Sequence, residues 1–355
     1  MKNNIKVLLT TSISDTRDFY VASAPPIGLC RLQHYLVKRG IECDVLDLSI
    51  RPELEPDYVS MVGQGIYDIV GISVSHHNMI PELETLWKFR TACEKNNKEC
   101  LFVAGGQEAT LNYEQWLEAG IDLILMGFAE KRLHELCLRF SENNTIDVSE
   151  LVKGMDGYAV RNKKGQVIFE PAKPFTPKEF RELTFEQLME MDTPYEDYWS
   201  ELRKVSDVLN FHNNKFIPET ARIFTASHCP MVCAFCSSRA FLPDAQEAIT
   251  PVIMLSASEV HELIVQHVHK YGAKFFLLSD DDFVLGSKVG LKRVFDLCEL
   301  IIESKNNGTI PTDIGFYVQT RVDVFLTRTD KNEKVVNWDL IDAMKGAGIC
   351  SFGIG

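Results

Sequence analysis

The sequence predicts an α/β protein in which an N-terminal doubly wound, Rossmann-like domain is followed by an incomplete βα barrel. Two observations lead to this fold class. Strand-length apolar runs alternate with amphipathic helical patterns over the first 150 residues, and the same alternation returns from about residue 216. Apolar strands between such helices indicate parallel sheets covered by helices. We therefore expect domains at residues 1–150 and 216–355, joined by a hairpin and linker at 151–215.

Five apolar runs are expected to form the N-terminal sheet. They are residues 5–10, 43–48, 69–74, 100–104 and 123–126. Between the first two runs, Leu29, Leu32 and Leu36 recur at helical spacing before Gly40, and a second helical pattern begins near Pro81. Doubly wound sheets bind ligands at the carboxyl ends of their strands. Polar or glycine-rich turns follow three of the runs, so this edge is the expected binding site.

The same kind of pattern predicts the elements of the linker and of the C-terminal domain. Residues 152–160 and 166–169 have the pattern of two strands around a turn, and the prolines that follow indicate an ordered linker. Further strands are expected at 223–226, 274–279, 314–319 and 349–353. A capping box from Ser256 to Glu259 predicts the start of the helix between the first two of these. Such repeats suit a parallel barrel with reactive groups at its strand ends.

Three cysteines, Cys229, Cys233 and Cys236, form a C-x3-C-x2-C cluster directly after the run 223–226. Three thiolates are one fewer than a closed zinc site or a fully ligated iron–sulfur cluster requires. One coordination position of the metal is therefore left without a protein ligand, and a reacting molecule can bind there. Two other interpretations remain: a zinc loop completed by His228 or a remote cysteine, and a chance grouping of buried cysteines.

This spacing, with the aromatic Phe235 before the last cysteine, resembles the signature of the radical S-adenosylmethionine (SAM) superfamily. The resemblance implies that the cysteines bind three irons of a [4Fe-4S] cluster and that Phe235 belongs to the cofactor site. The fourth iron would chelate SAM, and one electron from the cluster would cleave it to a 5′-deoxyadenosyl radical. An electron donor such as flavodoxin or ferredoxin is implied as a partner.

The N-terminal turns resemble the cobalamin-binding domain of one subgroup of that superfamily. The matching pieces are Pro25-Pro26-Ile27-Gly28-Leu29, the turn with Ser73 and Ser75, the pair Gly105-Gly106, and Gly127-Phe128-Ala129-Glu130, which varies a G-E-G-E pattern. The resemblance implies that the two serines, the glycine pair, Gly127 and Glu130 bind cobalamin. A D-x-H-x-x-G motif is absent from the first loop, so we expect cobalamin without a protein histidine on cobalt. A domain that keeps the fold but binds nothing is the alternative.

Two strand ends of the C-terminal domain carry polar motifs. Asp280-Asp281-Asp282-Phe283 and Gln319-Thr320-Arg321-Val322-Asp323 resemble the D-D-x-F and Q-x-R-x-D stretches of the same subgroup. Asp280 and Asp281 are expected to bond SAM or substrate, or else to cap a helix or form an oxygen cluster. Gln319 and Arg321 are expected to clamp a carboxylate, because arginine suits planar, bidentate recognition.

The chain ends at residue 355, inside an expected strand, where members of the subgroup continue. We therefore expect a barrel that is truncated at the C-terminus. Such a fragment need not be active alone, even if the full protein is an enzyme.

Composition narrows the classes of function. A net charge of −13 argues against a nucleic-acid partner. The apolar runs are far shorter than the roughly 18 residues of a membrane span, and the N-terminus lacks an export signal. The seven cysteines outside the cluster fall singly on apolar faces, which is typical of a reducing compartment. These features predict a cytoplasmic protein without a membrane partner.

The expected reaction is a cobalamin-dependent methyl transfer to an unactivated carbon of a small-molecule or peptide substrate. A radical SAM cyclase, oxidase or rearrangement enzyme, in which cobalamin has no methyl-transfer role, is the main alternative. A non-catalytic metal- or cobalamin-binding sensor is the alternative from another class, and it would keep its effect in a Cys236→Ala variant. Fold alone does not decide among them.

Overall fold

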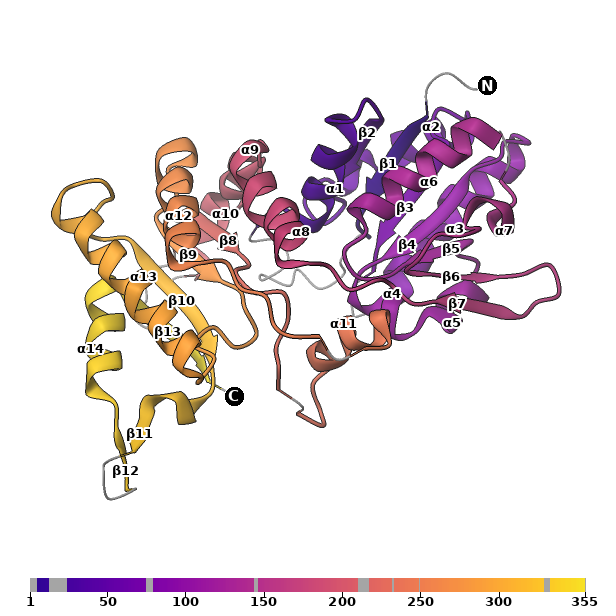
Figure 1. Cartoon of the computed structure of the whole chain (residues 1–355). Helices are drawn as coiled ribbons and strands as arrows, with labels where there is room; N and C mark the ends of the chain where they lie inside the picture. The colour runs from indigo at the N-terminus through magenta and orange to yellow at the C-terminus, as the bar shows by residue number, and fades with distance from the viewer. Residues whose placement is uncertain are drawn as a thin grey trace. The chain divides into compact units, whose positions relative to one another are not determined.

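The computed structural model describes residues 5–12, 24–74, 79–143, 146–209, 217–231, 233–248, 250–328 and 333–354. The chain forms two compact units (Figure 1). Unit 1 comprises residues 1–175 and 232–250, and unit 2 comprises residues 176–231 and 251–355. The stretch 232–250 therefore belongs to unit 1 although it lies late in the sequence. Within the described ranges, no helix is both long and apolar enough to cross a membrane.

Unit 1 is built on a seven-stranded sheet in the order β2-β1-β3-β4-β5-β6-β7. Its parallel strands are β1 (Lys6–Thr10), β2 (Glu42–Leu46), β3 (Ile69–Ser73), β4 (Leu101–Gly105) and β5 (Leu123–Leu125). The hairpin of β6 (Tyr158–Arg161) and β7 (Val167–Glu170) continues the sheet with antiparallel pairing to β5. The hairpin expected in the connector is thus an edge of the N-terminal sheet.

Helices cover both faces of this sheet. They are α1 (Ile27–Val37), η1 (Pro52–Leu54), α2 (Glu55–Gly63), α3 (Met79–Lys95), α4 (Gln107–Leu111), α5 (Tyr113–Glu118), α6 (Glu130–Asn143), α7 (Val148–Leu151) and α11 (Ser238–Gln246). Alternate strand residues enter two separate cores: Val70 packs with residues of α2, α3 and α5, whereas Ile69 packs with residues of α1 and α6. The predicted doubly wound arrangement is confirmed.

Unit 2 contains a four-stranded, all-parallel sheet in the order β8-β9-β10-β13. Its elements are β8 (Thr220–Ile223), α12 (Ala257–Tyr271), β9 (Phe275–Leu278), α13 (Lys288–Asn306), β10 (Gly315–Thr320), η3 (Val322–Phe325), β11 (Leu326–Arg328), β12 (Lys334–Val336), α14 (Trp338–Ala347) and β13 (Ile349–Ile354). Successive parallel strands are neighbours, and a helix lies between each pair along the chain. This is the arrangement of the expected incomplete βα barrel. The capping box at Ser256 is present, with Glu259 as its partner.

The expected linker after Pro174 contains four consecutive helical elements. They are α8 (Pro177–Arg181), η2 (Glu182–Glu186), α9 (Gln187–Glu190) and α10 (Tyr195–Leu209). Thr176 and Glu179 form a capping box, with Pro177 at the first helical position. Proline fits there because its missing N–H would be unpaired in any case. The prolines of this stretch predicted an ordered linker, whereas Pro177 begins helix α8.

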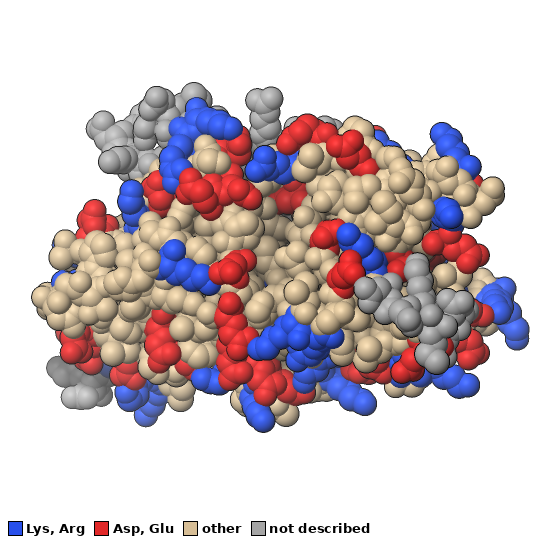
Figure 2. Space-filling model, turned by 90° about the horizontal axis from the view of Figure 1, so that it is seen from above, with Lys and Arg blue, Asp and Glu red and all other residues tan. Residues whose placement is uncertain are grey.

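Charged side chains of both signs are intermixed on the face shown in Figure 2. Among the described residues of the chain, Lys292 pairs with Asp296 at 2.6 Å and Arg203 with Glu196 at 2.7 Å. Exposed pairs of this kind contribute about 0–1 kcal/mol each. The stability of the fold therefore depends mainly on the buried apolar residues.

His267 gives unit 2 a pH-dependent stability. Its ring is 1 % exposed, its Nδ1 donates to the Leu263 carbonyl, and it contacts the rings of Tyr195 and Tyr271. Burial lowers the pKa of His267 to about 4. The ring takes up a proton near pH 6.5 in the unfolded chain but only near pH 4 in the folded one. The contribution of His267 to the free energy of unfolding is therefore fully present above pH 6.5 and is lost as the pH falls from 6.5 to 4.

We expect the free energy of unfolding to drop by about 2 kcal/mol between pH 7 and pH 5 through His267 alone. A His267→Gln variant cannot take up this proton and keeps a donor for Leu263. Urea unfolding of both proteins at the two pH values measures the difference. An equally steep pH dependence in the variant would contradict the assignment.

Candidate functional site

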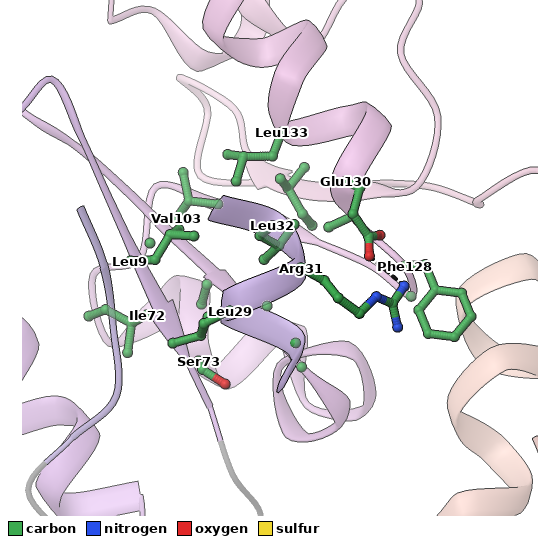
Figure 3. A pocket seen from close by; sticks show the side chains of 18 residues that line it. Leu9, Leu29, Arg31, Leu32, Ile72, Ser73, Val103, Phe128, Glu130 and Leu133 are labelled. Carbon is green, nitrogen blue, oxygen red and sulfur yellow. Dashed lines mark hydrogen bonds and ion pairs between the residues drawn. The ribbon is translucent and has the colours of Figure 1, made fainter. Parts of the chain in front are cut away.

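A cavity lies at the carboxyl edge of the parallel strands of unit 1 (Figure 3). Its volume is about 170 Å³, and its walls come from β1, β3, β4, β5, α1 and the segment that leads into α6. Most of the lining is apolar, with Leu9, Leu29, Leu32, Ile72, Val103 and Leu133 among its residues. Concave, largely apolar sites at this edge are where doubly wound domains bind ligands.

Five of the six residues predicted to bind cobalamin line this cavity. They are Ser73, Gly105, Gly106, Gly127 and Glu130. The parallel register explains part of the grouping, since Ser73 at the end of β3 lies opposite Gly105 at the end of β4. The sixth residue, Ser75, lies outside the described residues, as do His76 and His77.

The cavity depends on glycine at several positions. Gly106 has φ +111°, and a Cβ there would come within 2.8 Å of the Val74 carbonyl oxygen. A Cβ at Gly71 would meet the side chain of Leu9 at 2.7 Å. Gly28 is different, because a Cβ there would meet no atom within 4 Å. Gly28 therefore borders the cavity at a position with room for a side chain, whereas Gly106 and Gly71 permit close packing against the Val74 backbone and the Leu9 side chain.

The polar groups of the cavity are few. Ser73 is half-buried, and its hydroxyl makes no hydrogen bond with another described residue. At the opposite side, Arg31 Nη2 donates to Glu130 Oε1 at 2.5 Å, and the guanidinium lies 5.0 Å from the ring centre of Phe128 (Figure 3). Arg31 and Glu130 are 7 % and 3 % exposed, and neither Arg31 Nε nor Glu130 Oε2 has a partner among the described residues.

Arg31 was not identified from the sequence. It lies in α1 between the buried residues Leu29, Cys30 and Leu36. A charged residue within the apolar pattern of a helix was the available signal, because such a residue needs a buried partner. The partner, Glu130, is 99 residues away, so no local pattern could name it.

The cysteine segment is divided between the units. Cys233 and Cys236 fall in unit 1 and Cys229 in unit 2. All three side chains are half-buried, and the Cys236 N–H donates to the Cys233 carbonyl at 3.2 Å. Phe235 is 91 % exposed. No group of three histidine, cysteine or acidic side chains in the described part of the chain is arranged to hold a metal ion.

Helix α11, directly after Cys236, packs on the cavity side of unit 1. It contacts α4, and Gln107 Nε2 donates to Ser237 Oγ at 3.2 Å. Leu242 of α11 is 1 % exposed and lies against Gly127. These contacts place the segment with the last two cysteines on the same unit as the cavity.

In unit 2, Asp280 is buried at the end of β9 and anchors the residues that lead to Cys229. Its Oδ1 accepts from the N–H groups of Thr225 at 2.6 Å and Ala226 at 2.9 Å. Its Oδ2 accepts from the Thr225 hydroxyl, which in turn accepts from Arg293. Burial raises the pKa of Asp280, and the nearby Arg293 guanidinium opposes the rise. Asp280 thus contacts protein, while the neighbouring Asp281 is exposed.

Arg321 lines a second pocket of about 470 Å³ in unit 2, with Met231 and Asp282. Its Nη1 donates to the Met231 sulfur at 2.7 Å, its Nη2 lies 3.0 Å from Asp323 Oδ2, and its Nε lies 3.7 Å from Asp282 Oδ2. A ligand carboxylate would therefore compete with two protein carboxylates for Arg321. Gln319, the other predicted clamp residue, is exposed and bonds the Tyr317 hydroxyl at 3.3 Å.

The residues present fit both implied cofactors chemically. The open space beside Gly28, the apolar lining, and a Ser73 hydroxyl without a hydrogen-bond partner among the described residues suit an apolar group with a polar edge. Three half-buried thiols suit an iron–sulfur cluster, since thiolates are its usual ligands. The cavity and the cysteine segment are therefore the two candidate cofactor sites.

Comparison with known proteins supports the first of these sites. The B12 binding domain family matches residues 20–137, which include the cavity residues from α1 to α6. No curated protein matches the chain. The predicted cobalamin-binding type of the N-terminal domain is confirmed.

Two solved structures share the fold of the whole chain. One is the cobalamin-dependent S-adenosylmethionine radical enzyme OxsB with aqua-cobalamin bound, with a TM-score of 0.69 and 17 % identity over 99 % of this chain and 44 % of that chain. The other is the radical S-adenosylmethionine methyltransferase TsrM from Kitasatospora setae, with cobalamin and a [4Fe-4S] cluster bound, at a TM-score of 0.64 and 17 % identity over 99 % of this chain and 61 % of that chain. The chain spans about half the length of these structures.

Proposed function

We propose that this chain carries the cofactor-binding part of a cobalamin-dependent radical SAM enzyme that transfers a methyl group to an unactivated carbon. The observation that carries the proposal is the cavity of unit 1, which gathers Ser73, Gly105, Gly106, Gly127 and Glu130 within a domain that matches the B12 binding family. The radical part of the proposal is supported by the three-cysteine motif of this sequence. The methyl-transfer step is supported by one structural neighbour, TsrM, which is a methyltransferase.

In this proposal the cavity holds the nucleotide tail of cobalamin. The apolar wall of Leu29, Ile72 and Val103 excludes water from the tail, and the Ser73 hydroxyl is available to bond its polar edge. Gly105 and Gly106 let the backbone approach a flat ligand closely. The buried Arg31–Glu130 pair fixes the turn that follows β5, so that this wall is preorganised.

The cluster is assigned to Cys229, Cys233 and Cys236. When bound, it supplies the electron that cleaves SAM, and cobalamin supplies the methyl group. Asp280 is assigned a positioning role, because its bonds to Thr225 and Ala226 fix the chain just before Cys229. The pocket beside Met231 and Arg321 is assigned to SAM or substrate, and the exposed Asp281 is proposed to contact one of them.

The first test is an anaerobic reconstitution with iron, sulfide and hydroxocobalamin, followed by removal of unbound cofactor. We expect the absorption spectrum to show both the broad band of an iron–sulfur cluster and the corrinoid bands. A Cys236→Ala variant should lose the cluster band and keep the corrinoid bands, because the cavity is formed by other residues of unit 1. A spectrum without corrinoid would refute the cobalamin proposal, and zinc in place of a cluster would refute the radical one.

Product analysis then separates methyl transfer from the other radical reactions. Methyl transfer uses one SAM as the methyl source and a second as the radical source. S-adenosylhomocysteine and 5′-deoxyadenosine should therefore form together. Formation of 5′-deoxyadenosine alone would favour a cyclisation, oxidation or rearrangement.

A further inference from the structure

We propose that Gln107 couples the cobalamin cavity to the cysteine segment, so that each cofactor strengthens the binding of the other. The inference rests on the proposed function, since it assigns a role to a residue between the two proposed cofactor sites. Gln107 is a positioning residue in this scheme: it touches Ser237, next to Cys236, and follows Gly106, which lines the cavity.

The first connection runs through the start of α4. The Gly106 carbonyl accepts from the N–H of Thr110 at 3.1 Å and from its hydroxyl at 3.0 Å, so the cavity wall is fixed to the first turn of the helix. Gln107 is the next residue, and its amide donates to the Ser237 hydroxyl at 3.2 Å. A ligand that rests on Gly105 and Gly106 therefore restricts the residue that holds Ser237.

A second contact joins α11 to the turn after β5, which also lines the cavity. Gly127 lines the cavity, and a Cβ placed on it would lie 3.4 Å from the Leu242 side chain and 3.8 Å from Ala245 Cβ. The Ala172 N–H also donates to the Ala245 carbonyl at 2.7 Å. Helix α11 thus packs against α4 and against the turn at Gly127 within unit 1, and Cys233 and Cys236 lie just before it.

This arrangement implies a reciprocal effect. A ligand in the cavity reduces the freedom of α4 and α11 and lowers the cost of ordering the two cysteines for a cluster. Linkage requires that a bound cluster then raises the affinity for cobalamin by the same factor. One hydrogen bond of ordinary strength corresponds to about a fivefold coupling.

The experiment compares the dissociation constant of hydroxocobalamin for apoprotein and for cluster-loaded protein, measured by anaerobic equilibrium dialysis. We expect cluster-loaded wild type to bind cobalamin about fivefold more tightly. Gln107→Met and Ser237→Ala should each reduce this ratio below about twofold, and the double variant should reduce it no further. Asn112→Ala is the matched control, because it removes a side-chain hydrogen bond to Glu108 of α4, and Asn112 makes no hydrogen bond to α11 within the described residues.

The possible outcomes separate the inference from the proposed function. If both cofactors bind but hydroxocobalamin has the same dissociation constant for apoprotein and for cluster-loaded wild type, the coupling is refuted and the proposed function stands. A fivefold ratio that persists in Gln107→Met and Ser237→Ala refutes the assigned route. If hydroxocobalamin binds neither form, the cobalamin proposal itself fails. Loss of coupling in Asn112→Ala would show a general effect of α4 and overturn the role of Gln107.

Discussion

Replacement of Gly28 by leucine is expected to weaken hydroxocobalamin binding by about a hundredfold or more, which is about 2.8 kcal/mol at about 1.4 kcal/mol per tenfold change. Gly28 lines the cavity, and a Cβ there meets no protein atom within 4 Å. Because Gly28 borders a space of about 170 Å³, we expect a leucine side chain there to occupy part of the space that the ligand needs. Within the free protein it creates no steric conflict at its Cβ.

Stability should not fall in this variant. Gly28 is the second residue of α1, and glycine is about 1 kcal/mol less favourable in a helix than alanine or leucine. Equilibrium dialysis gives the affinity, and urea unfolding gives the stability. Gly28→Ala is the matched control, since it makes the same change in helix propensity and fills little of the cavity. If Gly28→Leu bound hydroxocobalamin as tightly as wild type does, cobalamin would not bind in this cavity.

The parallel strands could be predicted from the sequence because burial on both faces makes them continuous apolar runs. β3 is an example, since Ile69, Val70, Gly71 and Ile72 are all buried. The start of α12 was predictable for another reason: a capping box consists of residues three apart, so its signal is local. Features that are determined by residues close together in the sequence could therefore be predicted from it.

The same limit explains what could not be predicted. The position of α11 in unit 1 depends on contacts of Leu242 and Ser237 with segments more than 100 residues earlier. The Arg31–Glu130 pair likewise joins α1 to α6 through two residues that are 99 positions apart in the sequence. The strand-end position of Asp280 was predictable, but its burial depends on Thr225 and Arg293, which the fold brings to it. Long-range pairing of single polar residues leaves no periodic pattern.

Removal of the Asp280 carboxylate is expected to lower the free energy of unfolding of unit 2 by about 3–5 kcal/mol, the usual cost of breaking a buried charged network. Asp280→Ala leaves two backbone N–H groups without their acceptor and Arg293 without the nearby negative charge. Urea unfolding measures the loss. Asp281→Ala is the matched control, because that carboxylate is exposed and a surface substitution changes stability by about 0.5 kcal/mol or less.

A folded Asp280→Asn variant tests the positioning role apart from stability. Its amide keeps the volume of the carboxylate, and its oxygen can still accept from the N–H groups of Thr225 and Ala226. The amide is uncharged, however, and its NH₂ replaces the oxygen that accepts from the Thr225 hydroxyl. Because hydrogen bonds to a charged acceptor are stronger, the two N–H groups should exchange with solvent faster in the variant. Because these residues precede Cys229, cluster loading should fall. The cluster-free variant should bind cobalamin as tightly as cluster-free wild type, since the cavity lies wholly in unit 1. Equal loss of both cofactors would point to general unfolding. Unchanged exchange at Thr225 and unchanged cluster content would mean that Asp280 does not position the cysteine segment.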